Sequence, residues 1–301
     1  MYNEIAIIAP TASGKTDLSI NLAHKTNAII LSLDSLAVYK QIDIASAKPT
    51  LKERDGIVHF GIDEVYPDES FDVVEFIECY KRARDYAKEN GKNLIIVGGT
   101  GFYLKGMIEG LSPSPSITQE ISKKVDQELE NLESAYDLLK GLDPSHMKKI
   151  EKNDKYRLTK ALEIYFSSGL IPSEYFAKNK PIPIIKNLKI FQIETDVQLL
   201  RQRIALRTKK MLQNGIIDEV IMLEKLYTRA PKSMKSIGII ETLDYLDGKI
   251  DKKSLEELIT THTAQLAKRQ RTFNKSQFSN VFKGDLSTLS KEIPLQMNCC
   301  V

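Results

Sequence analysis

Residues 9–16 are Ala9-Pro10-Thr11-Ala12-Ser13-Gly14-Lys15-Thr16, and this run stands between a short apolar stretch, Ile5–Ile8, and a predicted helix from Thr16 to about Lys25. A strand, a glycine-containing loop, Lys-Thr and a helix form an arrangement that cradles phosphate, because backbone N–H groups and the helix N-terminus face an anion. Lys15 adds a positive charge, and the Thr16 hydroxyl suits a magnesium ion. The pattern usually begins with glycine, and here Ala9 takes that position. The run predicts a phosphate or diphosphate site, with an ordinary strand-to-helix turn as the alternative.

The order of the elements after this loop predicts the fold class. Ala28–Leu33 and Leu94–Val97 are again continuous apolar runs, which are typical of parallel strands covered on both faces. A helix is expected near Phe71–Asn90, ending at Gly91. Strands that alternate with helices predict an α/β fold with a P-loop NTPase-like parallel sheet, flanking helices, and ligands at the carboxyl ends of the strands.

The pattern changes after Gly110. A Ser/Pro linker at 111–116 leads into a stretch from about Thr118 to Ala177 that reads as wholly helical, and a strand returns at Leu188–Ile193. We therefore expect an all-helical insertion domain at 113–185 within an α/β core formed by 1–112 and 186–283. The core ends with helices at about 199–214, 216–227 and 254–273, and residues 284–301 are expected to be a tail without a structural signal.

Composition and charge bound the class of protein. The chain has 301 residues, 42% hydrophobic and 28% charged, without a run of about 20 apolar residues that would span a bilayer. The first strand starts too early for a signal peptide, and Cys79, Cys299 and Cys300 form no metal or disulfide pattern, so we expect a cytoplasmic protein that binds no membrane. We also expect a monomer.

Positive charge is concentrated in one third of the chain. Residues 199–283 carry 17 Lys and Arg against 9 Asp and Glu, which suggests an anionic partner such as nucleic acid or, alternatively, a solvated helical surface. Arg203, Arg207 and Lys210 recur at helical spacing, so they share one face of their helix. Lys268, Arg269 and Arg271 crowd together on the last helix and carry the same two interpretations.

Two further strand ends carry candidate chemistry. Asp34 ends the second apolar strand and would reach the same sheet edge as the phosphate loop, where it is a magnesium ligand, a general base or merely the N-cap of a turn. The third strand ends in Gly98-Gly99-Thr100-Gly101, where an ATPase usually has a magnesium-binding Asp. The loop therefore favours the diphosphate of something other than ATP. His59 and His262 have no partner that the sequence identifies.

Several blocks together make the sequence similar to the tRNA dimethylallyltransferases. They are the phosphate loop, Asp34-Ser35 followed by Val38-Tyr39-Lys40, Asp43–Pro49, Gly98–Tyr103, Arg157 with Ala161–Tyr165, and Ala267–Gln270. The blocks occur in the family's order from about Ile5 to Phe278. The phosphate loop alone is common, but the combination at these spacings is highly specific.

This resemblance implies an activity. A member of the family transfers the dimethylallyl group from dimethylallyl diphosphate to N6 of adenosine 37 in tRNA, with Mg²⁺, and gives N6-(dimethylallyl)adenosine. It implies that the loop Ala9–Thr16 and Arg207 bind the diphosphate, that Thr16 is the residue toward the metal, and that Asp34 is the catalytic base. Thr100 would act beside Asp34 in the reaction channel and contact tRNA.

The resemblance also implies a set of tRNA contacts, some at positions that depart from the family pattern. Ala37 and Ser122 stand where relatives have other residues, Ser122 in place of an arginine, and Ile239 and Phe273 replace a common tyrosine and tryptophan. Two other classes fit parts of the sequence: a small-molecule kinase fits the loop and Asp34, and a non-catalytic RNA-binding protein fits the basic third. The implied contacts to the anticodon stem-loop are Asp34, Ser35, Leu36, Ala37, Thr100, Ser122, Arg157, Lys160 and Arg269.

Overall fold

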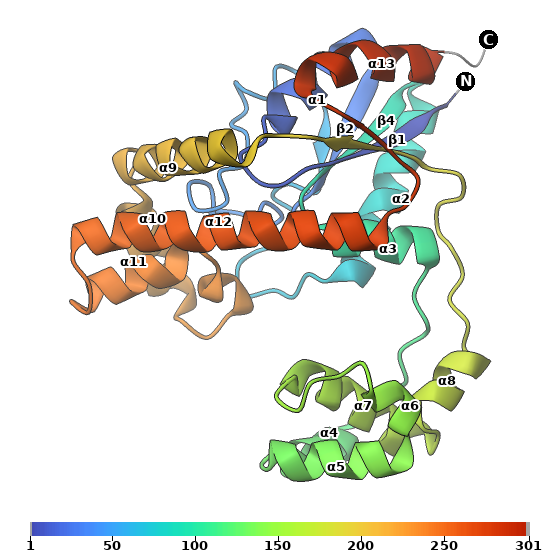
Figure 1. Cartoon of the computed structure of the whole chain (residues 1–301). Coiled ribbons are helices and arrows are strands. Elements are labelled where there is room, and N and C mark those ends of the chain that lie inside the picture. Colours follow the sequence, from blue (N-terminus) through green and yellow to red (C-terminus); the bar gives the residue numbers. More distant parts are fainter. Residues whose placement is uncertain (1, 299–301) are drawn as a thin grey trace. The chain divides into compact units, whose positions relative to one another are not determined.

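The computed structural model describes residues 2–298, which form two compact units (Figure 1). One unit, here the core unit, combines the residues up to Ile108 with those from Ile185 onward. The other, here the insertion unit, spans Glu109–Ile184, compared with the 113–185 expected from the sequence.

The core unit is built on a parallel sheet. Six strands in the described part of the chain pair in the order β3-β2-β4-β1-β5-β6, and each neighbouring pair is parallel. The predicted α/β class is confirmed, and so are the four predicted strands. Strands β3 and β6, which are short and only partly buried, were not predicted. The strands are β1 Glu4–Ile8, β2 Ala28–Leu33, β3 His59–Phe60, β4 Asn93–Gly98, β5 Lys189–Ile193 and β6 Val281–Gly284.

The carboxyl ends of β1, β2 and β4 lie side by side in the sheet. Gly98 of β4 pairs with Ile8 of β1 on one side and with Leu33 of β2 on the other. The phosphate loop after β1 and Asp34 after β2 therefore start at the same edge of the sheet, as the sequence predicted. Glycine is required at Gly98, because a Cβ there would overlap the backbone of Leu33.

Helices cover both faces of the sheet. Helices α1 (Lys15–Lys25) and α13 (Leu286–Asn298) share an apolar cluster with inward-facing residues of the strands, including Ile7 and Ile30. Successive strand residues point to opposite faces of the sheet, so the remaining residues of β2 and β4 face the other way. Helix α2 (Val73–Glu89) packs on these two strands from that face (Figure 1). This double cover explains the continuous apolar runs of β1, β2 and β4.

The expected tail at 284–301 is wrong for its described part. Strand β6 adds to the edge of the sheet, and α13 places Leu289, Ile293 and Met297, which are all buried, against α1. The apolar residues of α13 recur at helical spacing, but this pattern alone does not show what the helix packs against. Its packing on α1 identifies it as part of the core. Cys299 and Cys300 lie outside the described residues.

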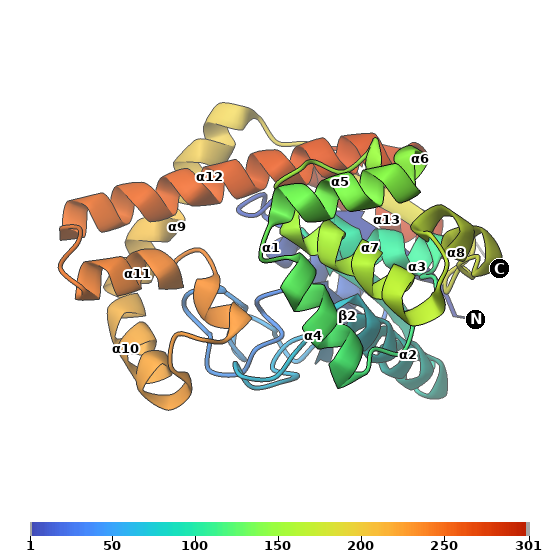
Figure 2. The same cartoon turned by 90° about the horizontal axis from the view of Figure 1, so that it is seen from below.

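The C-terminal helices form a second apolar cluster beside the sheet. The predicted helices are confirmed as α9, α10 and α12, whereas α3 and α11 were not predicted. Met211, Val220 and Leu255 of these helices pack with Ile42 and Ala45 from the loop after β2. Figure 2 shows α12 running along this part of the core unit. The C-terminal elements are α9 Val197–Gln213, α10 Ile216–Tyr227, the 3₁₀ helix Lys232–Lys235, α11 Ile239–Leu246 and α12 Lys252–Gln277. Helix α3, Gly101–Glu109, follows β4 instead.

The insertion unit is helical, as predicted, and has its own core. Asp154 caps α7 by accepting the N–H of Arg157, and Gly169 ends it with φ 69°. Leu158 and Leu162 of α7 lie in an apolar cluster that the other helices complete. No helix among the described residues of either unit has the length and apolar character needed to cross a membrane. The helices are α4 Gln119–Glu128, α5 Leu132–Leu142, α6 Pro144–Met147, α7 Lys155–Ser168 and α8 Pro172–Lys178.

Candidate active site

The phosphate loop connects β1 to α1 with the geometry that its glycine implies. Gly14 is the N-cap of α1 and has φ 88°, a left-handed conformation that glycine adopts without strain. A Cβ on Gly14 would also lie 2.9 Å from the Leu286 side chain of α13. Ala9, in place of the usual glycine, is buried in the core of the sheet and donates its N–H to the Gly98 carbonyl at 3.1 Å. Alanine therefore fits this position and adds an apolar contact.

One polar atom of the loop is left for a ligand. The Ser13 hydroxyl is buried, and nothing in the described part of the chain forms a hydrogen bond with it. A buried polar group without a partner is unfavourable. A bound anion at the N-terminus of α1 would supply that partner, consistent with the predicted phosphate site.

Two cations approach the loop from different elements. Burial lowers the pKa of Lys15 to about 8, while the negative charge of Asp34 opposes this effect and Arg207 adds to it. Burial also lowers the pKa of Arg207, again against the effect of Asp34. Lys15 and Arg207 are both desolvated and, among the described residues, have only the Asp34 carboxylate between them. The pair therefore carries a surplus positive charge, which a diphosphate would neutralise.

The basic face of α9 is directed at the loop. Arg207 donates from Nη1 to the Thr11 hydroxyl and from Nη2 to the Ser46 carbonyl, both at 3.0 Å. Arg203 donates to the Ser13 carbonyl at 3.1 Å. These contacts exclude the solvated-surface interpretation for both arginines, whereas Lys210, on the same face, is exposed.

Asp34 and Thr100 meet at the carboxyl ends of β2 and β4. One oxygen of Asp34, Oδ1, accepts the N–H groups of Leu36 at 2.9 Å and Ala37 at 3.2 Å. The Thr100 hydroxyl accepts the N–H of Ser35 at 3.2 Å. Asp34 thus caps the turn that follows it, one of the roles expected from the sequence. Its second oxygen, Oδ2, accepts no hydrogen bond from the described residues and remains for chemistry.

Gln270 of α12 is a site residue that the sequence reasoning did not select. Its side-chain oxygen accepts the Thr11 N–H of the phosphate loop at 2.9 Å. A Cβ on Gly99 would lie 2.4 Å from its amide nitrogen, so Gln270 would have to move if residue 99 carried a side chain. Gln270 thereby joins the loop to the end of β4, and its place in the Ala267–Gln270 block was the only signal that could have identified it.

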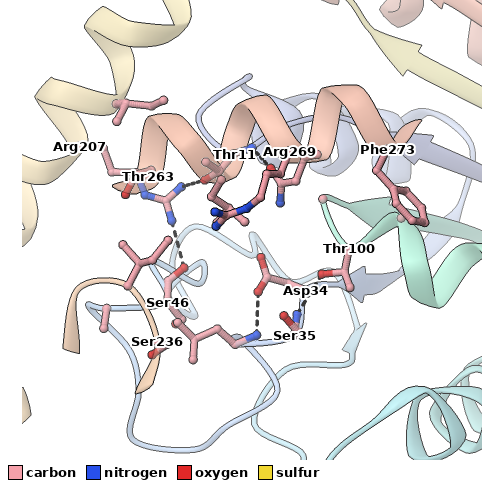
Figure 3. A pocket seen from close by; sticks show the side chains of 18 of the residues that line it. Thr11, Asp34, Ser35, Ser46, Thr100, Arg207, Ser236, Thr263, Arg269 and Phe273 are labelled. Atoms are coloured by element: carbon pink, nitrogen blue, oxygen red, sulfur yellow. Dashed lines mark hydrogen bonds between the residues drawn. The ribbon is translucent and has the colours of Figure 1, made fainter. Parts of the chain in front are cut away.

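Thr11, Asp34, Thr100, Arg207 and Gln270 line a cavity of about 490 Å³. Lys15 and Thr16 line a smaller cavity of about 60 Å³, which shares Asp34, Ser46 and Arg207 with the first. Figure 3 shows Asp34, Thr100, Arg207 and Arg269 around the larger cavity, with Phe273 of α12 at one side. Polar groups at the strand ends therefore face an apolar wall within one space. The apolar and small residues of that wall are Leu36, Ala45, Gly99, Gly101, Phe102, Ile204, Met211, Ile237, Leu266 and Phe273.

The residues expected to contact tRNA divide between the two units. In the core unit, Asp34, Ser35, Leu36, Thr100 and Arg269 line the larger cavity, whereas Ala37 is only 3% exposed and lines the smaller cavity with Lys15 and Thr16.

The remaining three expected contacts lie on helices of the insertion unit. Ser122 is exposed on α4, and Arg157 and Lys160 are exposed on α7. Each of these two cations pairs with an acidic residue three positions away, Arg157 with Asp154 at 3.2 Å and Lys160 with Glu163 at 2.7 Å.

His262 has a partner that only the structure identifies. Its Nδ1 lies 2.5 Å from the carboxylate of Glu241, a side chain that is 2% exposed. The other oxygen of Glu241 accepts the Gly238 N–H at 2.6 Å. Because Ser236 and Ile237 line the cavity, this pair supports one of its walls.

The fold and the site define a phosphate-loop protein of the α/β class whose loop faces an apolar cavity containing a carboxylate. The model of the IPP transferase family matches residues 37–277. The chain belongs to this family, whose curated relatives are tRNA dimethylallyltransferases.

Individual relatives agree with this assignment. The chain is 58% identical to the tRNA dimethylallyltransferase of Aliarcobacter butzleri, over 96% of this chain and 97% of the relative, and 53% identical to that of Sulfurovum sp., over 96% of each. Among solved structures, it is similar to the tRNA isopentenylpyrophosphate transferase of Bacillus halodurans, with a TM-score of 0.71, 29% identity, and coverage of 98% and 95%. It is also similar to a eukaryotic dimethylallyltransferase acting on tRNA, with a TM-score of 0.81, 27% identity, and coverage of 98% and 77%.

Proposed function

We propose that this protein transfers the dimethylallyl group of dimethylallyl diphosphate to N6 of adenosine 37 in tRNA. The observation that carries the proposal is the cavity itself, in which Thr11 of the phosphate loop, the Asp34 carboxylate and an apolar wall face one space in a chain of this family. A kinase would need room for a phosphoryl acceptor but not this extended apolar wall. We further propose that the protein acts as a cytoplasmic monomer.

The diphosphate would bind at the N-terminus of α1. The loop N–H groups, the Ser13 hydroxyl and the cations Lys15 and Arg207 all favour an anion there. Negative charge on the diphosphate grows as the bond to the prenyl carbon breaks, so these fixed cations stabilise the transition state more than the bound substrate.

Asp34 would serve as the base. The N6 amine of adenine attacks C1 of the dimethylallyl group, the C–N bond forms, the C–O bond to the diphosphate breaks, and the N6 proton passes to the Asp34 carboxylate. A neutral adenine amine is a poor nucleophile, so it needs both a positioned base and a stabilised leaving group. Thr100 and the Leu36 and Ala37 N–H groups hold the turn that aims the carboxylate.

Magnesium fits the chemistry of these residues. Mg²⁺ keeps several waters and is usually bound by few protein ligands together with substrate phosphates. The described residues contain no group of three or more His, Cys, Asp and Glu side chains that could form a closed metal site. The Thr16 hydroxyl, in the first turn of α1, would hold the ion together with diphosphate oxygens. The ion would neutralise charge on the leaving diphosphate.

The tRNA would present adenosine 37 out of its stack. A base in the anticodon loop leaves the stack at lower cost than a base in a duplex, and aromatic side chains such as Phe273 suit its flat face. Arg269, which is exposed at the cavity, would neutralise backbone phosphate.

The test is a product assay. The protein is incubated with unmodified tRNA, Mg²⁺ and dimethylallyl diphosphate, and the nucleosides are analysed by mass spectrometry, with position 37 mapped in an isolated anticodon-loop fragment. Prenylated adenosine at that position is the expected product. ATP turnover without this product would favour a kinase, and tRNA binding without any product would favour a non-catalytic RNA-binding protein.

A further inference from the structure

Glu219 holds the backbone of a loop that is far from it in sequence. It stands in the first turn of α10, and its Oε2 accepts the N–H groups of Asp43 at 2.9 Å and Ile44 at 2.7 Å. Its Oε1 accepts the N–H of Ala45 at 2.9 Å. One carboxylate therefore binds three successive N–H groups of the segment after β2.

This contact is costly to break. Burial raises the pKa of Glu219, against the three N–H donors, which favour the ionised carboxylate. Hydrogen bonds to an ionised carboxylate are stronger than those between neutral groups, and the three backbone donors would lose their partner if the carboxylate were removed. The position of residues 43–45 consequently depends on Glu219.

The held segment continues directly into the diphosphate site. Ser46 comes next in the chain, and its carbonyl accepts Nη2 of Arg207 at 3.0 Å, while Nη1 of the same guanidinium holds Thr11. Both Ala45 and Ser46 line the cavity. The guanidinium is thus fixed between the phosphate loop and the segment that Glu219 holds.

Lys48 provides a second restraint on this part of the chain. Lys48 donates to the Tyr39 carbonyl at 2.9 Å and pairs with Asp43 and Asp63. Because Lys48 restrains the chain on the far side of Ser46, loss of Glu219 alone would shift the Ser46 carbonyl rather than unfold the loop.

We propose that Glu219 is a positioning residue for the prenyl donor: by holding residues 43–45, it places the Ser46 carbonyl that orients Arg207 toward the diphosphate. Glu219 does not line the cavity and acts through Arg207. The inference rests on the proposed function, since it assigns the diphosphate of the donor to the loop and to Arg207.

The test compares Glu219→Gln with Asp218→Asn. Glutamine is similar in size to glutamate, but only the oxygen of its amide can accept hydrogen bonds. Its NH₂ group would face a backbone N–H, so at least one of the three hydrogen bonds would be lost. We expect the KM for dimethylallyl diphosphate to rise about tenfold in Glu219→Gln, with little change in kcat at saturating donor or in the KM for tRNA. Asp218 is an exposed acid in the same turn of α10, so Asp218→Asn removes the same helix-end charge and should behave as the wild type.

A double-mutant cycle with Arg207→Lys separates positioning from general stability. If Glu219 acts through Arg207, the donor KM of the double variant will equal that of Arg207→Lys alone. The proposal would be overturned if the two substitutions multiplied their effects on the donor KM. It would also be overturned if Glu219→Gln raised the KM for tRNA as much as the KM for the donor. Should Glu219→Gln fail to fold, Glu219→Asp provides the same comparison, with the affinity for inorganic diphosphate measured by calorimetry. A wild-type protein that does not prenylate tRNA refutes the proposed function, whereas an active wild type with a normal Glu219→Gln donor KM refutes only this inference.

Discussion

The two carboxylate oxygens of Asp34 have different surroundings. Oδ1 caps the turn at Leu36 and Ala37, and Oδ2 faces no donor among the described residues. The geometry confirms the N-cap, one of the alternatives that the sequence left open, and it leaves the second oxygen available for the proposed role as a base. A single carboxylate could serve both roles, because the cap fixes the rotamer in which the free oxygen reaches the cavity.

Asp34→Asn should separate these two functions. An asparagine oxygen can still accept the Leu36 and Ala37 N–H groups, so the fold persists, but the second atom becomes a non-basic amide. We expect the single-turnover rate on tRNA to fall about 10²-fold or more, with little change in tRNA affinity. A variant that loses tRNA binding yet reacts normally once bound would make Asp34 a positioning residue instead.

Lys15 should make donor capture sensitive to alkaline pH. Burial lowers its pKa to about 8, and in the proposed function its charged form would bind the diphosphate, so the site would be competent below that pH and would lose its ammonium charge above it. We expect kcat/KM for dimethylallyl diphosphate, which reports the free enzyme, to decline as the pH rises through 8. Lys15→Ala should have a much weaker donor affinity and no such decline. Full activity of Lys15→Ala at saturating donor would contradict a role in the transition state.

At the scale of the elements, three helices of the insertion unit meet at one side chain, Asp143. Asp143 is the C-cap of α5 and the N-cap of α6, where its Oδ1 accepts the His146 N–H at 3.0 Å. Its Oδ2 accepts the Ser173 N–H of α8 at 2.7 Å. One buried carboxylate thus joins the ends of three helices, so their packing depends on its charge.

This junction predicts acid sensitivity of the insertion unit. Burial by itself would raise the pKa of Asp143, but the N–H groups of Ser173 and His146 and the Ser145 hydroxyl outweigh it and lower that pKa to about 2. A depressed carboxylate pKa contributes stability above the unfolded value of about 3.9, and this stability is lost as the pH falls from there toward 2. Hydrogen exchange in peptides from 109–184 should therefore accelerate across that window.

Asp143→Ala tests the same junction at neutral pH. It should destabilise the insertion unit by about 1–3 kcal/mol, because two backbone donors lose their partner. Asp126→Ala, at an exposed position on α4, is the matched control and should leave exchange unchanged. Equal exchange in both variants would mean that the helix ends are held by apolar packing alone.

At the scale of the whole molecule, the two units have separate apolar cores. The cluster around Leu158 and Leu162 contains only residues of the insertion unit, and the cavity is lined only by residues of the core unit. Chemistry can therefore be tested apart from the insertion unit. Its exposed Arg157 and Lys160 are suited to phosphate contacts that position RNA without specifying a sequence.

Replacing residues 118–177 with a short Gly/Ser linker should leave a folded core that binds dimethylallyl diphosphate. The same protein should lose most of its affinity for tRNA and its activity on tRNA, since its remaining RNA contacts would be those near the cavity. Calorimetry with the donor and filter binding with tRNA measure the two effects. In the full chain, Arg157→Gln with Lys160→Gln should weaken tRNA binding and lower its salt dependence. Wild-type binding of both ligands by the shortened protein would show that the insertion unit is not the RNA-binding element.

The sequence by itself determined the four central strands, most of the helices, and the groups that local order places at one sheet edge. Apolar runs predicted β1, β2, β4 and β5, and because parallel strands end at the same edge, the phosphate loop and Asp34 could be brought together without coordinates. The expected role of Arg207 came from the family resemblance, and helical spacing placed it on one face with Arg203. These features depend on residues within a few turns of one another, or on the fixed geometry of a sheet.

Only the tertiary structure decided which distant residues complete the site. Gln270 reaches Thr11 across 259 positions, and Glu219 reaches Ala45 across 174. α13, expected to be a tail, closes the core beside α1. No periodicity encodes such pairs, because each depends on how whole helices pack on the sheet. Packing, rather than local propensity, therefore decides that a glutamine on α12 and a glutamate on α10 hold the two loops beside the proposed diphosphate site.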